Sequence, residues 1–273
     1  MSPTSATAWL ASYPKSGNTW VRAQLSTLES GSEPALKKLG RSREHDRMST
    51  SLGVPLGDLS PAETAAVLRL SWTIHDPDHH GYLRRKTHRA WTPAADGFPV
   101  PWQPPHARAI YIVRDPRAIV ASWAHHAGAS LEDAVTSMGT ALQPLARLDA
   151  HGDQDLMSWT KHVASWLDDC TLPQLVVRYE DMIEAPDREL TRMAEFLKMP
   201  HTAESIAAAT QACSFASLAA QEIVEGFSEA GRVGQTFFRR GQADAWKDEL
   251  PAELIAQVCQ DHGPMMRRLG YLT

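Results

Sequence analysis

The sequence predicts an α/β fold in which a central parallel sheet is flanked by helices. Short apolar runs rich in β-branched residues, typical of buried strands, recur along the chain. A loop and then apolar residues at three- and four-residue spacing, typical of a helix, follow most of these runs. The composition, 43% hydrophobic and 22% charged over 273 residues, suits one substantial core. Strands that alternate with helices imply parallel pairing and helices on both faces.

Two strand-to-helix units are the clearest elements. The run TAWLAS stops at Tyr13-Pro14, ahead of a helical pattern. The β-branched run RAIYIV precedes Asp115 as helix N-cap and Pro116 at the first helical position. In chain order we expect strands at 7–12, 82–88, 108–113 and 175–179, helices at 19–28, 60–72, 115–126, 131–147, 155–168, 186–198 and 202–211, and a helix pair within 250–269. Polar or Pro-rich loops are expected at 31–57, 75–81, 93–105 and 226–245.

Charge and cysteine content exclude several classes of protein. The net charge of −5 argues against a nucleic-acid binder that relies on long-range attraction, so any anionic ligand must be held locally. Cys170, Cys213 and Cys259 are widely spaced and form no metal-ligand pattern, which favours reduced thiols in a cytoplasmic protein. No apolar run approaches the 18 residues of a membrane span, and the start lacks a secretory pattern, so we expect no membrane partner.

The segment YPKSGNTW at 13–20 lies between the first strand and the first helix. Such a loop directs free backbone N–H groups and the positive helix end at one point, where a phosphate or sulfate can bind. Lys15 adds a positive charge, and Ser16, Asn18 and Thr19 add side-chain donors. The segment is not a Walker A loop, because its Lys precedes the glycine. On this motif alone, an ordinary strand-to-helix turn with an exposed Lys is an equally good interpretation.

This segment resembles the 5′-phosphosulfate loop of the sulfotransferases that use 3′-phosphoadenosine-5′-phosphosulfate (PAPS), with Asn18 where Thr is usual. Four further segments resemble family motifs and follow in the family's order. They are Lys86-Thr87-His88, the run IYIVRDPRAIVAS that ends at Ser122, VRYEDM at 177–182 and FRRGQADAWK at 238–247. Together the five segments span residues 7–247, and they imply a P-loop-like sulfotransferase fold.

The resemblance also implies roles for individual residues. It places Lys15, Ser16, Gly17, Asn18 and Thr19 on the 5′-phosphosulfate, Arg114, Ser122, Arg239, Arg240 and Gly241 on the 3′-phosphate, and Trp20, Tyr179, Ser214 and Phe215 around the adenine. Cys213 stands where the family has Thr or Ser, and Asp244-Ala245-Trp246 stands where it has Gly-Asp-Trp. The plainer alternatives are a structural ion pair for Arg114 and a solvated charge run for the paired arginines.

His88 is one of 12 histidines, and it is singled out by Lys86-Thr87 before it and by the resemblance. Sulfonate transfer needs a hydroxyl, phenol or amine that loses its proton as it attacks, and imidazole has a suitable pKa for that task. We therefore expect His88 to be the general base. Lys15 would neutralise charge on the leaving group, and Lys86 would neutralise the sulfonate oxygens.

No metal is expected to be required. The adjacent histidines at 79–80 and 125–126 cannot share one helix face as an i, i+4 pair would, and no Cys or carboxylate set completes a site.

The sequence thus predicts one sulfotransferase domain over 1–273, which moves a sulfonate from PAPS to a small-molecule acceptor and releases 3′-phosphoadenosine-5′-phosphate (PAP). Segments 31–85 and 123–155 are candidates for the acceptor pocket and its lid, and a hydroxylated secondary metabolite is the favoured acceptor. A monomer and a homodimer both fit.

Two rival functions remain open on the sequence. The first is a P-loop nucleotide kinase, which would bind ATP and Mg²⁺. This sequence lacks the Walker A residues of that class, which counts against this function. The second is a non-catalytic nucleotide-binding module, which predicts that His88→Ala leaves every function intact.

Overall fold

The computed structural model describes residues 6–39, 63, 66, 82–93, 99–100, 106–140, 156–227, 229–230 and 236–273. The helix expected at 60–72 lies outside these residues except for positions 63 and 66, which are both helical. Most of the loops expected at 31–57, 75–81 and 93–105 also lies outside them, as does the second half of the segment 123–155.

Four parallel strands form the central sheet in the order β2 (Tyr82–Thr87), β1 (Ala6–Ser12), β5 (Arg108–Val113) and β6 (Gln174–Arg178). β1 pairs with both β2 and β5, with Ala11 opposite Thr87 and Ser12 opposite Ile112. Val113 of β5 lies opposite Arg178 of β6. All four strands therefore end at the same edge of the sheet. The predicted parallel α/β fold is confirmed, and a separate short hairpin joins β3 (Thr92–Pro93) to β4 (Pro99–Val100).

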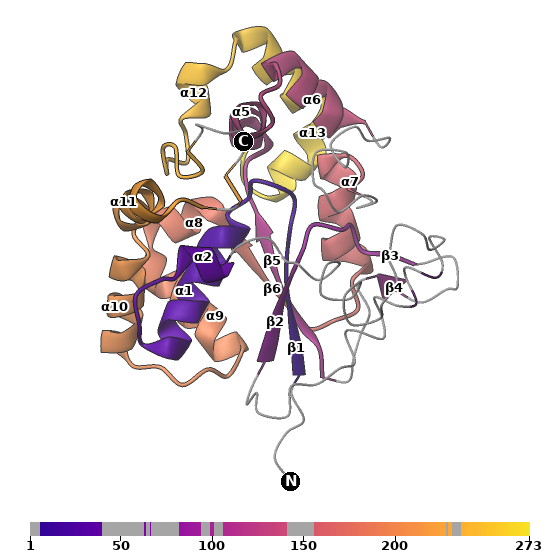
Figure 1. Cartoon of the computed structure of the whole chain (residues 1–273). Coiled ribbons are helices and arrows are strands. Elements are labelled where there is room, and N and C mark those ends of the chain that lie inside the picture. The colour runs from indigo at the N-terminus through magenta and orange to yellow at the C-terminus, as the bar shows by residue number, and fades with distance from the viewer. Residues whose placement is uncertain are drawn as a thin grey trace.

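Helices cover both faces of the sheet, as the alternation along β1 requires (Figure 1). Trp9 and Ala11 belong to one buried cluster, and Ala8 and Leu10 belong to another. The first cluster includes residues of α5 (Pro116–Ala127), α6 (Leu131–Gly139), α7 (Trp159–Ala164) and α13 (Ala252–Arg268). The second includes residues of α1 (Asn18–Ser30), α8 (Tyr179–Glu184), α9 (Pro186–Phe196) and α10 (Ala203–Ala212).

Four shorter or less expected elements complete the chain. They are α2 (Leu36–Leu39), a π-helix at Ser165–Asp169 that continues α7, α11 (Phe215–Glu225) and α12 (Trp246–Glu249). α11 packs through Leu218 against a third buried cluster, which includes Ala23 of α1 and Leu36 of α2. The polar stretch expected as loop at 226–245 is described at 226–227, 229–230 and 236–245, where it contains no helix or strand.

The predicted cap of α5 is confirmed, since the Asp115 side chain accepts a hydrogen bond from the Arg117 N–H at 2.9 Å and Pro116 opens the helix. Three expectations are corrected. The helix expected at 131–147 ends at Gly139, because Thr140 adopts extended backbone. The helix pair expected within 250–269 is one helix with Pro264 inside it. α11 was not predicted at all. All three cysteines are free, and among the described helices none is both long and apolar enough to cross a membrane.

Ile110 lies at the centre of the sheet with none of its surface exposed. We expect Ile110→Ala to lower the free energy of unfolding by about 2–5 kcal/mol. The substitution removes most of a side chain that lies between strands β1 and β6, and it leaves a cavity. Urea unfolding measures this change. Val224→Ala, at a side chain that is 84% exposed, is the control and should change the free energy by less than about 0.5 kcal/mol. Equal losses in the two variants would contradict the assignment of Ile110 to the core.

Candidate active site

The loop between β1 and α1 is shaped to receive an anion. Gly17 caps α1 with a φ of 100° and, as a glycine, offers no side-chain acceptor, so within the described residues no N-cap side chain binds the first backbone N–H groups of the helix. The Ser16 side chain is buried, and its Oγ has no hydrogen-bond partner among the described residues. A buried hydroxyl without a partner next to free N–H groups is what a phosphate or sulfate oxygen would satisfy.

Two glycines let aromatic rings approach the backbone closely. A Cβ on Gly17 would lie 2.6 Å from Cδ2 of Tyr179, and one on Gly241, whose φ is 63°, would lie 2.2 Å from Cδ2 of Phe215. Trp20 makes an edge contact with Tyr179, with 5.8 Å between ring centroids. The structure thus brings Trp20 and Tyr179 together at the loop, and it stacks Phe215 on the segment that follows Arg240.

Arg114 joins three of the predicted segments. Its guanidinium donates to the carbonyl of Lys15 at 3.0 Å and to that of Gln242 at 3.5 Å, and it lies 4.2 Å from the centroid of the Tyr179 ring. Its Nε is buried without a partner among the described residues. A single cation at the end of β5 therefore ties the first loop to the segment at 239–242.

Arg239 and Arg240 both form ion pairs, although Arg240 is exposed to solvent. Both contact Glu249 of α12, at 2.7 Å and 3.2 Å. Ser122 is half-buried on α5, and no hydrogen bond within the described residues links it to any of the predicted arginines. The Ser214 hydroxyl caps α11, where it accepts a hydrogen bond from Ser217 N–H at 3.3 Å.

Two predicted donors of the first loop are directed elsewhere. The Asn18 amide donates to the Leu10 carbonyl at 2.8 Å and to Ser12 Oγ at 3.3 Å, so both of its N–H bonds face β1. Its remaining Oδ1 is buried without a hydrogen-bond partner among the described residues. The Thr19 hydroxyl donates to Glu229 at 2.8 Å.

His88 follows β2 and is oriented by β1. Its Nδ1 lies 2.8 Å from the Ser12 carbonyl oxygen and 3.2 Å from Ser12 Oγ. Because a carbonyl can only accept, Nδ1 carries the proton and Nε2 keeps the lone pair. Burial first, and the positive charge of Lys86 second, lower the pKa of His88 to about 3. The imidazole is therefore neutral near pH 7, which is the state a general base needs.

The segment that carries His88 is held in place by α7 and the π-helix. His162 Nε2 lies 3.1 Å from the carbonyl of His88, and its Nδ1 lies 2.9 Å from the Tyr111 hydroxyl. Trp166 Nε1 donates to the Arg89 carbonyl at 3.0 Å, and Ser165 Oγ accepts from the Trp91 N–H at 2.9 Å. π-helical turns are frequent at functional sites. His162, Ser165 and Trp166 thus bind backbone groups of residues 88, 91 and 89.

Glu229 lies among the predicted anion-binding residues, and the sequence analysis missed it. Its carboxylate accepts hydrogen bonds from Thr19, from Arg22 at 2.9 Å and from Lys86 at 3.1 Å. Burial alone would raise the pKa of Glu229, but Lys86 and Arg22 outweigh it and lower the pKa to about 2. Residue 229 falls in a polar stretch without periodicity or motif, so the sequence carried no signal for it.

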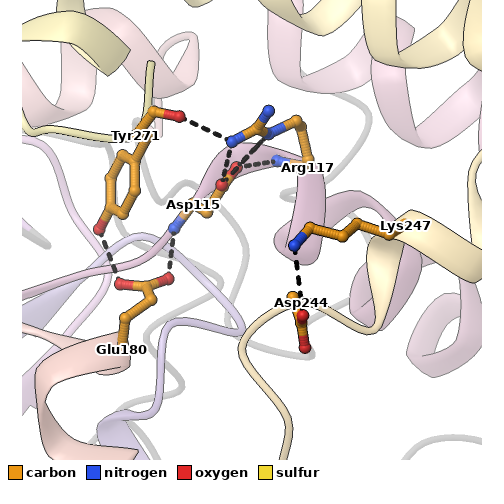
Figure 2. A network of polar contacts seen from close by, with 6 residues as sticks. All are labelled: Asp115, Arg117, Glu180, Asp244, Lys247 and Tyr271. Carbon is orange, nitrogen blue, oxygen red and sulfur yellow. Dashed lines mark hydrogen bonds and ion pairs between the residues drawn. The ribbon is translucent and has the colours of Figure 1, made fainter. Parts of the chain in front are cut away.

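A polar network supports the ends of β5 and β6 (Figure 2). Glu180 accepts from the Asp115 N–H and from the Tyr271 hydroxyl, each at 3.0 Å. Arg117 binds the Asp115 carboxylate at 2.6 Å and donates to the Tyr271 carbonyl at 2.8 Å. Arg114 and Tyr179 are the chain neighbours of Asp115 and Glu180, so the network braces both at the strand ends.

Cys213 and Asp244, the two positions that depart from the family pattern, make contacts that the structure defines. Cys213 is buried, its carbonyl accepts a hydrogen bond from Trp20 Nε1 at 2.8 Å, and its thiol donates to Thr27 Oγ1 at 3.5 Å. Asp244 is exposed and pairs with Lys247 at 3.3 Å, a surface contact worth little energy. Within the described part of the chain, no group of three or more His, Cys, Asp or Glu side chains could hold a metal ion.

A parallel sheet with an open helix N-terminus, two lysines and a neutral histidine at its carboxyl edge defines a phosphate-loop protein equipped for group transfer. The chain belongs to the sulfotransferase family, since residues 6–270 match the family described as Sulfotransferase domain. It is 24% identical over 269 residues to Cytosolic sulfotransferase 10 of Arabidopsis thaliana, covering 91% of this chain and 74% of that protein. It is 24% identical over 271 residues to Flavonol 3-sulfotransferase of Flaveria bidentis, covering 92% and 78%.

Solved structures agree on the fold. Mouse sulfotransferase SULT7A1 complexed with PAP superposes with a TM-score of 0.62 at 17% identity, covering 98% of this chain and 86% of that one. Retinol dehydratase in a complex with retinol and PAP gives a TM-score of 0.62 at 19% identity, with coverages of 97% and 82%.

The ion pairs of Glu229 predict a pH-dependent stability. The pKa of Glu229 in the folded protein, about 2, lies below its ordinary value of 4.5, so its stabilising contribution is present above the ordinary value and is lost as the pH falls toward 2. We expect Glu229→Gln to unfold at a lower urea concentration than wild type near neutral pH. The gap between the two proteins should shrink as the pH is lowered from about 5 toward 3. A gap that stays constant over this range would contradict the ionised, paired state of Glu229.

Proposed function

We propose that the chain transfers the sulfonate group of PAPS to a hydroxyl or amine of a small molecule by in-line displacement, with His88 as general base. The observation that carries this proposal is the orientation of His88. Its proton is committed to the Ser12 carbonyl, its other nitrogen is free to accept a proton, and it lies one residue beyond the strand that carries Lys86.

The residues at the carboxyl edge fit a 3′,5′-phosphorylated adenosine. The uncapped N-terminus of α1 and the Ser16 hydroxyl suit the 5′ end. Trp20, Tyr179 and Phe215 provide flat apolar surface for a base. Arg114, Arg239 and Arg240 suit the 3′-phosphate, because guanidinium groups bind phosphate oxygens in pairs.

Each side chain then has a definite task. When bound, PAPS supplies an activated sulfonate and a leaving group that carries its charge on phosphate oxygens. Lys15 sits beside the loop, 4.1 Å from the centroid of the Phe237 ring, and stabilises charge that develops on the leaving group. Lys86 faces the sulfonate oxygens. His88 Nε2 takes the proton from the attacking hydroxyl as the sulfur–oxygen bond forms.

The acceptor we propose is a small hydroxylated molecule. Two relatives and neighbours act on or bind small hydroxylated molecules, as their names state: a flavonol and retinol. We propose an acceptor of that size, bound near the described ends of segments 31–85 and 123–155; most of the first segment and the second half of the other lie outside the described residues. Mass spectrometry of reactions with PAPS and a panel of phenols, alcohols and amines tests the activity. Products heavier by one sulfonate support it. Phosphorylated products with ATP and Mg²⁺, and none with PAPS, would overturn it.

His88→Ala should lower kcat by about 10²- to 10⁴-fold, because it removes the base and leaves the phosphate-binding groups in place. The affinity for PAP should stay within about twofold of wild type, well under the tenfold change that 1.4 kcal/mol would produce. Steady-state kinetics and calorimetric titration measure the two quantities. His88→Asn is the matched variant, because its amide can still donate to the Ser12 carbonyl but cannot accept a proton. An active Asn variant would mean that His88 is structural.

Arg239→Ala should weaken PAP binding by roughly ten- to a hundredfold, the usual effect of losing a hydrogen bond to a charged group. The affinity for adenosine 5′-monophosphate, which lacks the 3′-phosphate, should hardly change. Arg268→Ala is the control, since Arg268 forms an exposed ion pair with Asp168. If Arg239→Ala weakened both nucleotides equally, Arg239 would not be the 3′-phosphate ligand.

A further inference from the structure

The carboxylate of Glu229 occupies donors that the proposed 5′ anion also requires. Oε1 accepts hydrogen bonds from Arg22 at 2.9 Å and from Lys86 at 3.1 Å, and Oε2 accepts from Thr19 Oγ1 at 2.8 Å. Thr19 belongs to the first turn of α1 and Lys86 to the end of β2. Two oxygens held by a hydroxyl and two cations are the arrangement that a phosphate or sulfonate would adopt at the same point.

The same carboxylate acts on the rest of the site. Only 7% of the Glu229 side chain is exposed, so its charge is weakly screened. His126 of α5 lies next to the site. The centroids of its ring and of the Phe237 ring are 6.4 Å apart, and Lys15 Nζ lies over the same Phe237 ring. Burial, followed by the charges of Lys15 and Lys86, lowers the pKa of His126 to about 4, and the charge of Glu229 acts in the opposite direction. The charges of Glu229, Lys15 and Lys86 therefore all act on His126.

We propose that Glu229 is an internal competitor of the 5′ anionic group of the nucleotide, and that its carboxylate holds Thr19 and Lys86 until that group replaces it. The inference rests on the proposed function. Two negative groups cannot share these donors, because like charges repel strongly where water is excluded. Each binding event must therefore break the Glu229 contacts, and the affinity for the nucleotide falls by the energy of breaking them.

A positioning role for Glu229 predicts the opposite sign. If the carboxylate aligned Lys86 and Thr19 for the ligand, its removal would weaken nucleotide binding. If it competes, its removal frees both donors and strengthens binding. The direction of the change in Kd therefore separates the two roles, and a purely structural role would affect ligands with and without a 5′-phosphate alike.

Calorimetric titration of Glu229→Gln with PAP and with adenosine 3′-monophosphate tests the proposal. We expect PAP to bind about tenfold more tightly than to wild type, the equivalent of one hydrogen bond to a charged group. Adenosine 3′-monophosphate, which lacks the 5′ group, should bind with nearly unchanged affinity. Glu225→Gln makes the same charge change at an exposed side chain on α11 and should leave both affinities unchanged.

Each other outcome is decisive. Unchanged or weaker PAP binding by Glu229→Gln overturns the competitor role, and equal tightening of both nucleotides overturns it as well. Failure of wild type to bind PAP would instead overturn the proposed function. If Glu229→Gln does not fold, Glu229→Ala replaces it, because it removes the carboxylate and with it both the negative charge and the acceptor of Lys86 and Thr19. It should also tighten PAP binding, and a weaker affinity would contradict the proposal.

Discussion

β1 is hydrogen-bonded in parallel to both β2 and β5, and β5 to β6, so four chain segments that are distant in sequence leave the sheet at one edge. Parallel pairing cannot place these ends elsewhere, because each strand must run in the same direction as its neighbour. The phosphate loop, His88, Arg114 and Tyr179 are the residues that follow the four strands. Their convergence is a consequence of the fold, and only their detailed orientation is left to side-chain contacts.

Orientation at this edge comes largely from the backbone. The Ser12 carbonyl selects the tautomer of His88, and the carbonyls of Lys15 and Gln242 hold the Arg114 guanidinium. Such contacts survive changes in neighbouring side chains, and they pre-organise the site before a ligand arrives. Several positively charged side chains at this edge are instead held by carboxylates. Glu229 holds Lys86 and Arg22, and Glu249 holds Arg239 and Arg240, so carboxylates of the chain itself pair with both groups of cations.

Local signals predicted much of the fold. The run RAIYIV and the pair Asp115-Pro116 specify a buried strand and a capped helix from side-chain sterics alone, and both lie where expected. The predictions failed where contacts between residues far apart in the sequence determine the structure. We expected a helix pair within 250–269, yet α13 is one helix that continues through Pro264 and packs against α6 and α7. The roles predicted for Lys15 and Lys86 were based on the sequence motifs that contain them. The partner of Lys86, Glu229, lies 143 residues away, and nothing local marks it.

Titration of the wild-type protein with PAP, adenosine 5′-monophosphate, and ATP with Mg²⁺ tests most directly whether the carboxyl edge of the sheet binds an adenosine phosphorylated at both its 3′ and 5′ positions. We expect PAP to bind with a Kd of roughly 1 μM or below, and each of the other two nucleotides to bind at least about tenfold more weakly. Preference for ATP with Mg²⁺, or no binding of PAP, would contradict this assignment of the site.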